Sequence, residues 1–207
     1  LTAQGYNLRV RDANGCLSSV LARTVTQPTA ISPGAVASAV SCFGGNNGSI
    51  TVTPSGGVGP YDFSIDGGAT YPVLDGTSNT FTNLTAGSYN IRVRDANNCQ
   101  TAVTPVSVSQ PAAAVTASTT PTNVLCFGAS TGAILVTPSG GVGPYDFSID
   151  GGTTYSVIDV ATNTFTSLAA GSYNIRVRDA NNCQSAVIPV TITQPAALSV
   201  STTPTNV

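Results

Sequence analysis

The sequence predicts an all-β protein built from tandem β-sandwich domains, and three observations lead to this prediction. The chain repeats itself: residues 42–111 align without a gap onto residues 126–195, and 52 of the 70 positions are identical. Glycine, proline and asparagine interrupt it at short intervals, with runs of alternating apolar and polar residues between them. The apolar spacing of an amphipathic helix is missing. One sandwich unit copied in tandem explains all three observations.

Two whole repeats are expected, the first repeat at residues 29–111 and the second repeat at residues 112–195. Residues 1–28 match the C-terminal part of a preceding repeat, with Cys16 equivalent to Cys99. Residues 196–207 match the start of a following repeat, and we expect them to form its first strand. The sequence is therefore expected to be a segment of a longer repetitive protein.

The composition excludes several classes of function. The chain is 41% hydrophobic with a net charge of −2, so it should fold. Its near-neutral charge argues against a nucleic-acid partner, and no apolar run approaches the roughly 20 residues that membrane insertion needs. His, Lys and Glu are absent, so nothing is placed to activate a nucleophile. We expect no enzyme activity and no cofactor.

About seven strands are expected in each repeat. In the first repeat they are residues 36–41, 49–54, 61–66, 70–74, 79–83, 88–94 and 101–109. The alternation is cleanest in the third and sixth of these. Pro105 and Pro189 lie in the last strand, which should therefore be an edge strand with a bulge.

A tyrosine motif sharpens the prediction of the fold. Leu84-x-Ala-Gly-x-Tyr89 recurs as Leu168-x-Ala-Gly-x-Tyr173. A tyrosine that opens the penultimate strand just after a glycine turn is typical of the tyrosine corner, in which its hydroxyl bonds backbone upstream. We therefore expect tandem immunoglobulin-like Greek-key sandwiches with strands A to G in order, and structural roles for Tyr89 and Tyr173.

Aspartates and arginines occupy the outward faces of two strands that should be neighbours. Asp62 and Asp66 lie on the third strand, and Arg92 and Arg94 lie on the sixth. Paired carboxylates would suit catalysis, but cross-strand Asp–Arg pairs explain both sets of charges and are favoured. The expected pairs are Asp62 with Arg94, Asp66 with Arg92 or Asn90, and Asp146 with Arg178.

A turn rich in Asp and Asn is a candidate calcium site. Its oxygen-bearing side chains are Asp95 and Asn97 in the first repeat, and Asp179 and Asn181 in the second. However, Ca²⁺ takes six to eight ligands, and Asp and Asn are also the residues that tight hairpins need. The turn interpretation is favoured and the metal site stays an alternative.

The five cysteines predict disulfides and an oxidising compartment. Cys42 and Cys126 follow the first strand, Cys99 and Cys183 precede the last, and the partner of Cys16 is expected outside the sequence. Two pairings are open. Cys42 bonds Cys99 and Cys126 bonds Cys183 within repeats, or Cys42 bonds Cys183, because the two turns lie at opposite poles of a sandwich. A disulfide needs Cα atoms within about 7 Å, so only one of the two pairings can form. We favour the pairing within repeats, since a short or crossed first strand would bring the two cysteines of one repeat within this distance.

The combined motifs resemble a known family. Cys42-Phe-Gly-Gly-Asn-Asn-Gly-Ser-Ile50, Gly56-Gly57, Pro60-Tyr61, the tyrosine motif, Asp95-Ala-Asn-x-Cys99 and Gln110-Pro111 together resemble the SprB repeat. Such repeats occur in large cell-surface adhesins of gliding Bacteroidetes-type bacteria. The resemblance implies long extracellular filaments, export by the type IX secretion system and gliding motility. Implied partners are neighbouring repeats, other filament chains and surface polysaccharide.

Two functions follow from this resemblance. The first is a structural stalk, and the alternative is a multivalent polysaccharide-binding array that gains by avidity. Tyr71 and Tyr155 are the aromatic residues not assigned to the core or corner, and Trp is absent, which favours the stalk. Gln-Pro pairs at residues 27–28, 110–111 and 194–195 should make semi-rigid junctions between repeats placed end to end.

Overall fold

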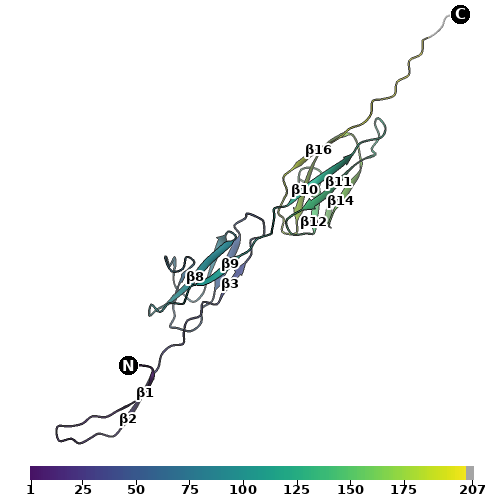
Figure 1. The fold of residues 1–207 in the computed structure, drawn as a ribbon. Helices are drawn as coiled ribbons and strands as arrows, with labels where there is room; N and C mark the ends of the chain where they lie inside the picture. Colours follow the sequence, from purple (N-terminus) through teal and green to yellow (C-terminus); the bar gives the residue numbers. More distant parts are fainter. Residues whose placement is uncertain (204–207) are drawn as a thin grey trace, which may run out of the picture. The chain divides into compact units, whose positions relative to one another are not determined.

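The computed structural model describes residues 1–203, and this part of the chain consists of strands and turns without a helix (Figure 1). Strands β1 (Gln4–Leu8) and β2 (Leu21–Val25) pair antiparallel as a two-stranded ribbon. The other strands in the described residues form four sheets, and each sheet takes its strands from one repeat.

The second repeat contains a three-stranded and a four-stranded sheet. The first has the order β10-β11-β14 and the second the order β13-β12-β15-β16, with antiparallel neighbours throughout. The strands are β10 (Thr116–Thr122), β11 (Gly132–Ser139), β12 (Tyr145–Ser148), β13 (Val157–Val160), β14 (Asn163–Leu168), β15 (Gly171–Asp179) and β16 (Ile188–Ile192).

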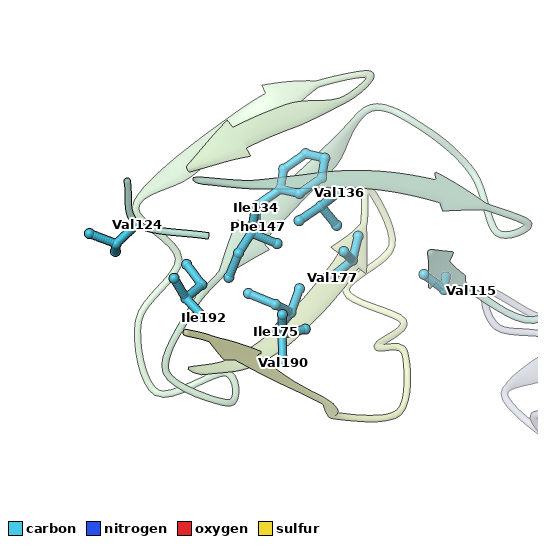
Figure 2. Close-up of a cluster of buried hydrophobic side chains, with 9 residues drawn as sticks. All are labelled: Val115, Val124, Ile134, Val136, Phe147, Ile175, Val177, Val190 and Ile192. Carbon is cyan, nitrogen blue, oxygen red and sulfur yellow. The ribbon is translucent and has the colours of Figure 1, made fainter. Parts of the chain in front are cut away.

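Alternate residues of these strands form the core of the second repeat. Because successive side chains of a strand point to opposite faces, every second residue along the central parts of β11 and β15 is fully buried. Figure 2 shows the side chains of both sheets converging between them. The buried cluster is Val115, Val124, Ile134, Val136, Phe147, Ile175, Val177, Val190 and Ile192. This arrangement is a two-layer β-sandwich.

The first repeat has the same strand order. Its sheets are β3-β4-β7 and β6-β5-β8-β9. The strands are β3 (Ala35–Ser38), β4 (Gly48–Val52), β5 (Tyr61–Ser64), β6 (Val73–Gly76), β7 (Asn79–Leu84), β8 (Gly87–Asp95) and β9 (Thr104–Val108). Ile50, Val52, Phe63, Ile91 and Val93 are fully buried, as are their counterparts in the second repeat. The predicted immunoglobulin-like sandwich is confirmed.

The structure differs from the sequence prediction in the fourth and seventh strands. The fourth strand was predicted at residues 70–74 and is formed by Val73–Gly76. It pairs with the third strand in both repeats, so it lies in the four-stranded sheet. The seventh strand lies at a sheet edge, as expected for a strand that contains proline. However, β16 pairs with β15 from Ile188 to Ile192 without a register shift. The predicted bulge is therefore absent from the pairing between β15 and β16.

The chain folds as two compact units whose limits do not follow the sequence repeats. One unit comprises Leu1–Ala37, Ile50–Phe81 and Ser88–Ser107, and the other comprises Ser38–Ser49, Thr82–Gly87 and the chain from Val108 onward. The loop that follows β3 therefore groups with the second repeat. The repeat boundaries at residues 28/29, 111/112 and 195/196 stay a prediction.

The predicted strand at residues 196–207 is not present in its described part. Residues 196–203 form no strand, and residues 204–207 lie outside the described residues. The equivalent strand β10 is held by antiparallel pairing with β11. Residues 196–203 pair with no strand of this kind, and an isolated extended segment gains no ladder of hydrogen bonds.

Two adjacent residues of β11 test the assignment of faces. Ile134 is fully buried, whereas Leu135 is 41% exposed on the opposite face. Ile134→Ala should lower the free energy of unfolding by about 2–5 kcal/mol, because it removes buried apolar surface and leaves a cavity. Leu135→Ala, the matched control, should change it by about 0.5 kcal/mol. Urea unfolding of both variants provides the measurement, and equal losses would contradict the assignment.

Candidate functional site

The outward face of the first repeat has a compact cluster of charged and aromatic side chains. Asp62 on β5 lies opposite Arg94 on β8, and Oδ2 of Asp62 accepts hydrogen bonds from Nη2 and Nε of Arg94 at 2.6 and 3.0 Å. Burial raises the pKa of Asp62, but the Arg94 guanidinium and the N–H of Asp75 together lower it by more. The net shift of the pKa is therefore downward. The Arg94 guanidinium also lies 4.4 Å from the centre of the Tyr71 ring.

The same cluster is present in the second repeat. Nε of Arg178 donates to Oδ2 of Asp146 at 2.7 Å, and its guanidinium lies 4.2 Å from the centre of the Tyr155 ring. Burial raises the pKa of Tyr155, although Arg176 and Arg178 oppose the shift. A partly exposed ion pair contributes about 0.2–1 kcal/mol, and a cation–π contact about 0.5–1 kcal/mol. The structure thus gives Tyr155 and its counterpart Tyr71 a packing role that the sequence had left unassigned.

The predicted pairing of Asp66 with Arg92 is wrong. The register places Ser64 opposite Arg92, and the carboxylate of Asp66 instead accepts hydrogen bonds from the Ser64 hydroxyl and from N and Oγ1 of Thr70. Nε of Arg92 donates to the carbonyl of Thr101 at 3.0 Å. The Ser64 hydroxyl, and next the Thr70 hydroxyl, hold the pKa of Asp66 well below its usual range. Asp66 therefore stabilises its own turn. Asn90, the other partner expected for Asp66, does lie beside it and forms a backbone bridge with it.

The carboxylates of the candidate calcium turn face backbone N–H groups. Oδ1 of Asp95 accepts from N of Asn97 and N of Cys99, both at 2.9 Å, and Oδ2 accepts from N of Val58 at 3.0 Å. Burial raises the pKa of Asp95, but these three N–H groups together lower it by more. The net shift of the pKa is therefore downward. Asp95 is only 4% exposed. Its oxygens are already directed at partial positive charges, which favours the turn interpretation over a cation site.

The turn of the second repeat has the same bonds. Oδ1 of Asp179 accepts from N of Asn181 and N of Cys183, both at 2.9 Å, and Oδ2 accepts from N of Val142. Asn181 is exposed, and its Nδ2 donates to the carbonyl of Ser41 at 3.1 Å. Among the described residues, no group of three or more His, Cys, Asp or Glu is placed to hold a metal ion.

The disulfide pairing favoured from the sequence is wrong. Cys42 is bonded to Cys183, with Cα atoms 5.6 Å apart, and both residues belong to the second compact unit. The bond therefore links the loop after the first strand of one repeat to the turn before the last strand of the next. A disulfide forms only where the Cα atoms approach within about 7 Å, and the structure satisfies this criterion with the pairing that the sequence analysis had left as the alternative.

The remaining cysteines are thiols in this structure. Cys16, Cys99 and Cys126 are free and exposed. The predicted partners of Cys99 and Cys126 were Cys42 and Cys183, and these two are bonded to each other. The predicted bonds Cys42–Cys99 and Cys126–Cys183 are therefore absent.

Tyrosine hydroxyls and glutamine side chains fix the loops. The Tyr173 hydroxyl donates to the carbonyl of Ala169 at 3.0 Å, which is the corner geometry, and Tyr89 is half-buried at the equivalent place. Sequence reasoning missed two further contacts. The Tyr61 hydroxyl donates to the carbonyl of Gly56 at 2.6 Å, and Oε1 of Gln110 accepts from N of Gly44 at 2.8 Å. The recurrence of both residues in each repeat was the available signal.

Comparisons with known proteins agree with this description. Residues 34–70 and 118–154 match the family model described as the SprB repeat, so the predicted resemblance is confirmed at two places in the chain. No curated protein matches the chain. No helix in the described residues is long and apolar enough to cross a membrane.

Two solved structures are similar to the chain. Fibronectin(III)-like modules of Clostridium thermocellum CbhA share 20% identity over 76% of this chain and 91% of theirs, with a TM-score of 0.34. A C-terminal 282-residue fragment of intimin, solved with the intimin-binding domain of its translocated receptor, shares 15% identity over 82% of this chain and 64% of its own, with a TM-score of 0.39. Because both TM-scores are low, the fold is established by the strand order and the core of this chain and not by its similarity to these two structures.

The disulfide can be tested with a matched pair of cysteine variants. Cys183→Ser should lower the free energy of unfolding by roughly 2–5 kcal/mol, because it releases a constraint on the unfolded chain. Cys99→Ser, which changes the same turn of the first repeat where the cysteine is a thiol, should change it by about 0.5 kcal/mol. Peptide mapping of the monomeric protein without reductant should recover a Cys42–Cys183 pair. Recovery of Cys42–Cys99 would contradict this assignment.

Acid should destabilise the folded protein. The pKa values of Asp62, Asp66, Asp95 and Asp150 lie below the ordinary value, so these groups stabilise the fold above about pH 4, the ordinary carboxylate pKa. This stabilisation is lost as the pH falls toward their lower folded values. The melting temperature should stay level between about pH 7 and pH 5 and fall below about pH 4.

A hydroxyl variant isolates the contribution of one carboxylate. Ser64→Ala removes the hydroxyl that donates to Asp66 at 2.6 Å. The Asp66 titration, followed by carboxyl NMR, should move to higher pH, because the largest cause of its lowered pKa is gone. An unchanged titration would show that the Thr70 contacts alone stabilise the carboxylate.

Proposed function

We propose that this chain is a structural stalk segment of a long extracellular cell-surface adhesin. The two SprB repeat matches support a surface-adhesin repeat. The disulfide supports an extracellular location, because disulfides persist in oxidising compartments. The finer proposal is that the filament serves surface attachment and gliding motility after export by the type IX secretion system.

The single observation that carries the stalk proposal is the bond between Cys42 and Cys183. This bond joins two loops that belong to successive sequence repeats. A covalent bond at this place resists separation of the two loops when the chain is pulled. A stalk needs that resistance, whereas a set of independent binding modules does not.

The charged groups of the repeats also favour a structural role. Asp62 and Arg94 bond each other, and the carboxylates of Asp66 and Asp95 accept hydrogen bonds within or beside their own turns. These side chains hold loops and strands in place, and they leave no activated nucleophile or general base among the described residues. We therefore propose no enzymatic role.

The polysaccharide-binding alternative depends on the two tyrosines that the sequence left unassigned. Tyr71 is half-buried with Arg94 over its ring, and Tyr155 is half-buried with Arg178 over its ring. A sugar would have to displace a guanidinium that also bonds an aspartate. No specific observation favours that alternative.

Antibodies raised against this chain test the location. They should label intact cells of the bacterium that carries the gene, because the proposed stalk is outside the cell. A short treatment of intact cells with protease should remove the label, and a cytoplasmic protein measured in the same cells is the control. Labelling only after permeabilisation would contradict the proposal.

Calorimetry with surface polysaccharide from the same cells separates the stalk from the array. The chain should show no saturable binding at millimolar saccharide, and Tyr71→Ala/Tyr155→Ala should behave as the unchanged protein. Saturable binding that the double variant loses would instead favour the binding array.

A further inference from the structure

The disulfide divides the chain into a part between its two cysteines and a part outside them. Every strand from β4 to β15 lies between Cys42 and Cys183, which are 141 positions apart in the sequence. The strands β3 and β16 lie outside, because β3 ends at Ser38 and β16 begins at Ile188. The Cα atoms of the two cysteines are only 5.6 Å apart, so the bond is a short covalent route past all of the strands between them.

The part between the cysteines contains most of the core of both sandwiches. Sixteen apolar side chains are buried in the described residues, and three of them, Val40, Val190 and Ile192, lie outside this part. The others include the two largest fully buried side chains, Phe63 and Phe147. Because burial of apolar surface is the dominant favourable term in folding, the bond bypasses the residues that stabilise each sandwich most.

A pulling force on this chain follows the covalent route through the sulfur atoms. When the chain is pulled from a point before β3 and a point after β16, the tension passes along β3 to Cys42, across the bond to Cys183, and along β16. Residues 43–182 form a loop that this bond closes, and the bond holds the two ends of the loop together. No tension is therefore applied across the strands of the loop.

The two strands that take the tension have little length to gain. A β-strand already rises about 3.3–3.4 Å per residue, and the limit for a fully extended chain is about 3.3–3.6 Å per residue. Both strands lie at a sheet edge, β3 beside β4 and β16 beside β15. Each is pulled in opposite directions at its two ends, so the tension is balanced within its own backbone. The hydrogen bonds to the neighbouring strand then take no net force.

The connections between these two strands and the cysteines are anchored to the folded part of the chain. On the side of β3, N of Val40 donates to the carbonyl of Ser109 at 2.8 Å. On the side of β16, N of Ser185 donates to the carbonyl of Val177 at 2.8 Å. Val40 and Ser185 are themselves buried. Little chain is therefore free to extend between either strand and its sulfur atom.

We propose that the Cys42–Cys183 bond is a mechanical bypass, which takes the tension on a pulled chain and keeps residues 43–182 folded while the tension lasts. These residues unfold under force only after the bond is reduced. Reduction frees about 460–500 Å of chain, because 141 residue spacings extend to at most about 3.3–3.6 Å each. The inference rests on the proposed stalk only for the force that it meets in the cell, and a force applied to the purified chain tests it separately.

Optical tweezers at constant force test the bypass on the whole chain, held through protein tags at its two ends. At a force at which Cys183→Ser extends in discrete unfolding steps, the oxidised protein should show none of these steps, and its final length should be shorter by about 460–500 Å. Cys99→Ser, the matched control, should extend as the unchanged protein does. The β1–β2 ribbon lies outside the bypass, so its extension should appear in every protein and identifies correctly attached molecules.

Reductant added at constant force tests whether the bypassed part has stayed folded. Dithiothreitol reduces the bond to two thiols and is itself oxidised to a cyclic disulfide. Extension should follow reduction only after a delay, in the same steps and at the same rates as those of Cys183→Ser. Because this measurement starts from the folded oxidised protein, it decides the question even where Cys183→Ser does not fold.

Two outcomes would overturn the bypass. A single step of the full length at the moment of reduction would mean that residues 43–182 had unfolded behind the intact bond. Equal extension of the oxidised protein and Cys183→Ser before reductant is added would mean that the tension does not pass through the bond. Neither outcome decides whether the chain is part of an extracellular stalk.

Discussion

A buried carboxylate beneath the turn before the last strand organises the end of each repeat. The Asp179 carboxylate bonds three backbone N–H groups, two within its own turn and one in the loop between β11 and β12. These bonds join segments far apart in the sequence and determine where Cys183 lies. Asp95 has the same bonds in the first repeat. The disulfide, and the second copy of its geometry around Cys99, both depend on this use of aspartate.

Several of the few charged side chains stabilise local structure. Asp66 and Asp150 accept hydrogen bonds from serine and threonine hydroxyls in their own turns, and Asp62 and Asp146 bond arginines across the sheet. Arginine in turn covers a tyrosine ring in each repeat. Because each group is engaged by a neighbour, the recurrence of these charges in both repeats is explained by folding, and a separate catalytic or metal-binding role is not needed to explain it.

The disulfide couples folding to the repetition of the sequence. Cys42 and Cys183 are 141 positions apart, a separation greater than the length of one repeat, so no single repeat can form the bond. Both kinds of cysteine loop recur in each repeat, which follows from the copying of one unit.

Local patterns in the sequence were sufficient for the fold and for part of the candidate site. Alternation determined which residues of β8 and β11 are buried, because the strand period is two, and it placed Asp62 opposite Arg94. The partner of Asp66, the sheet of the fourth strand and the pairing of Cys42 were decided by the tertiary structure. Each depends on register or on distances between loops that no local pattern encodes. A cysteine pair is chosen by a Cα separation of 5.6 Å, and that distance exists only after the loops have been positioned by the sheets.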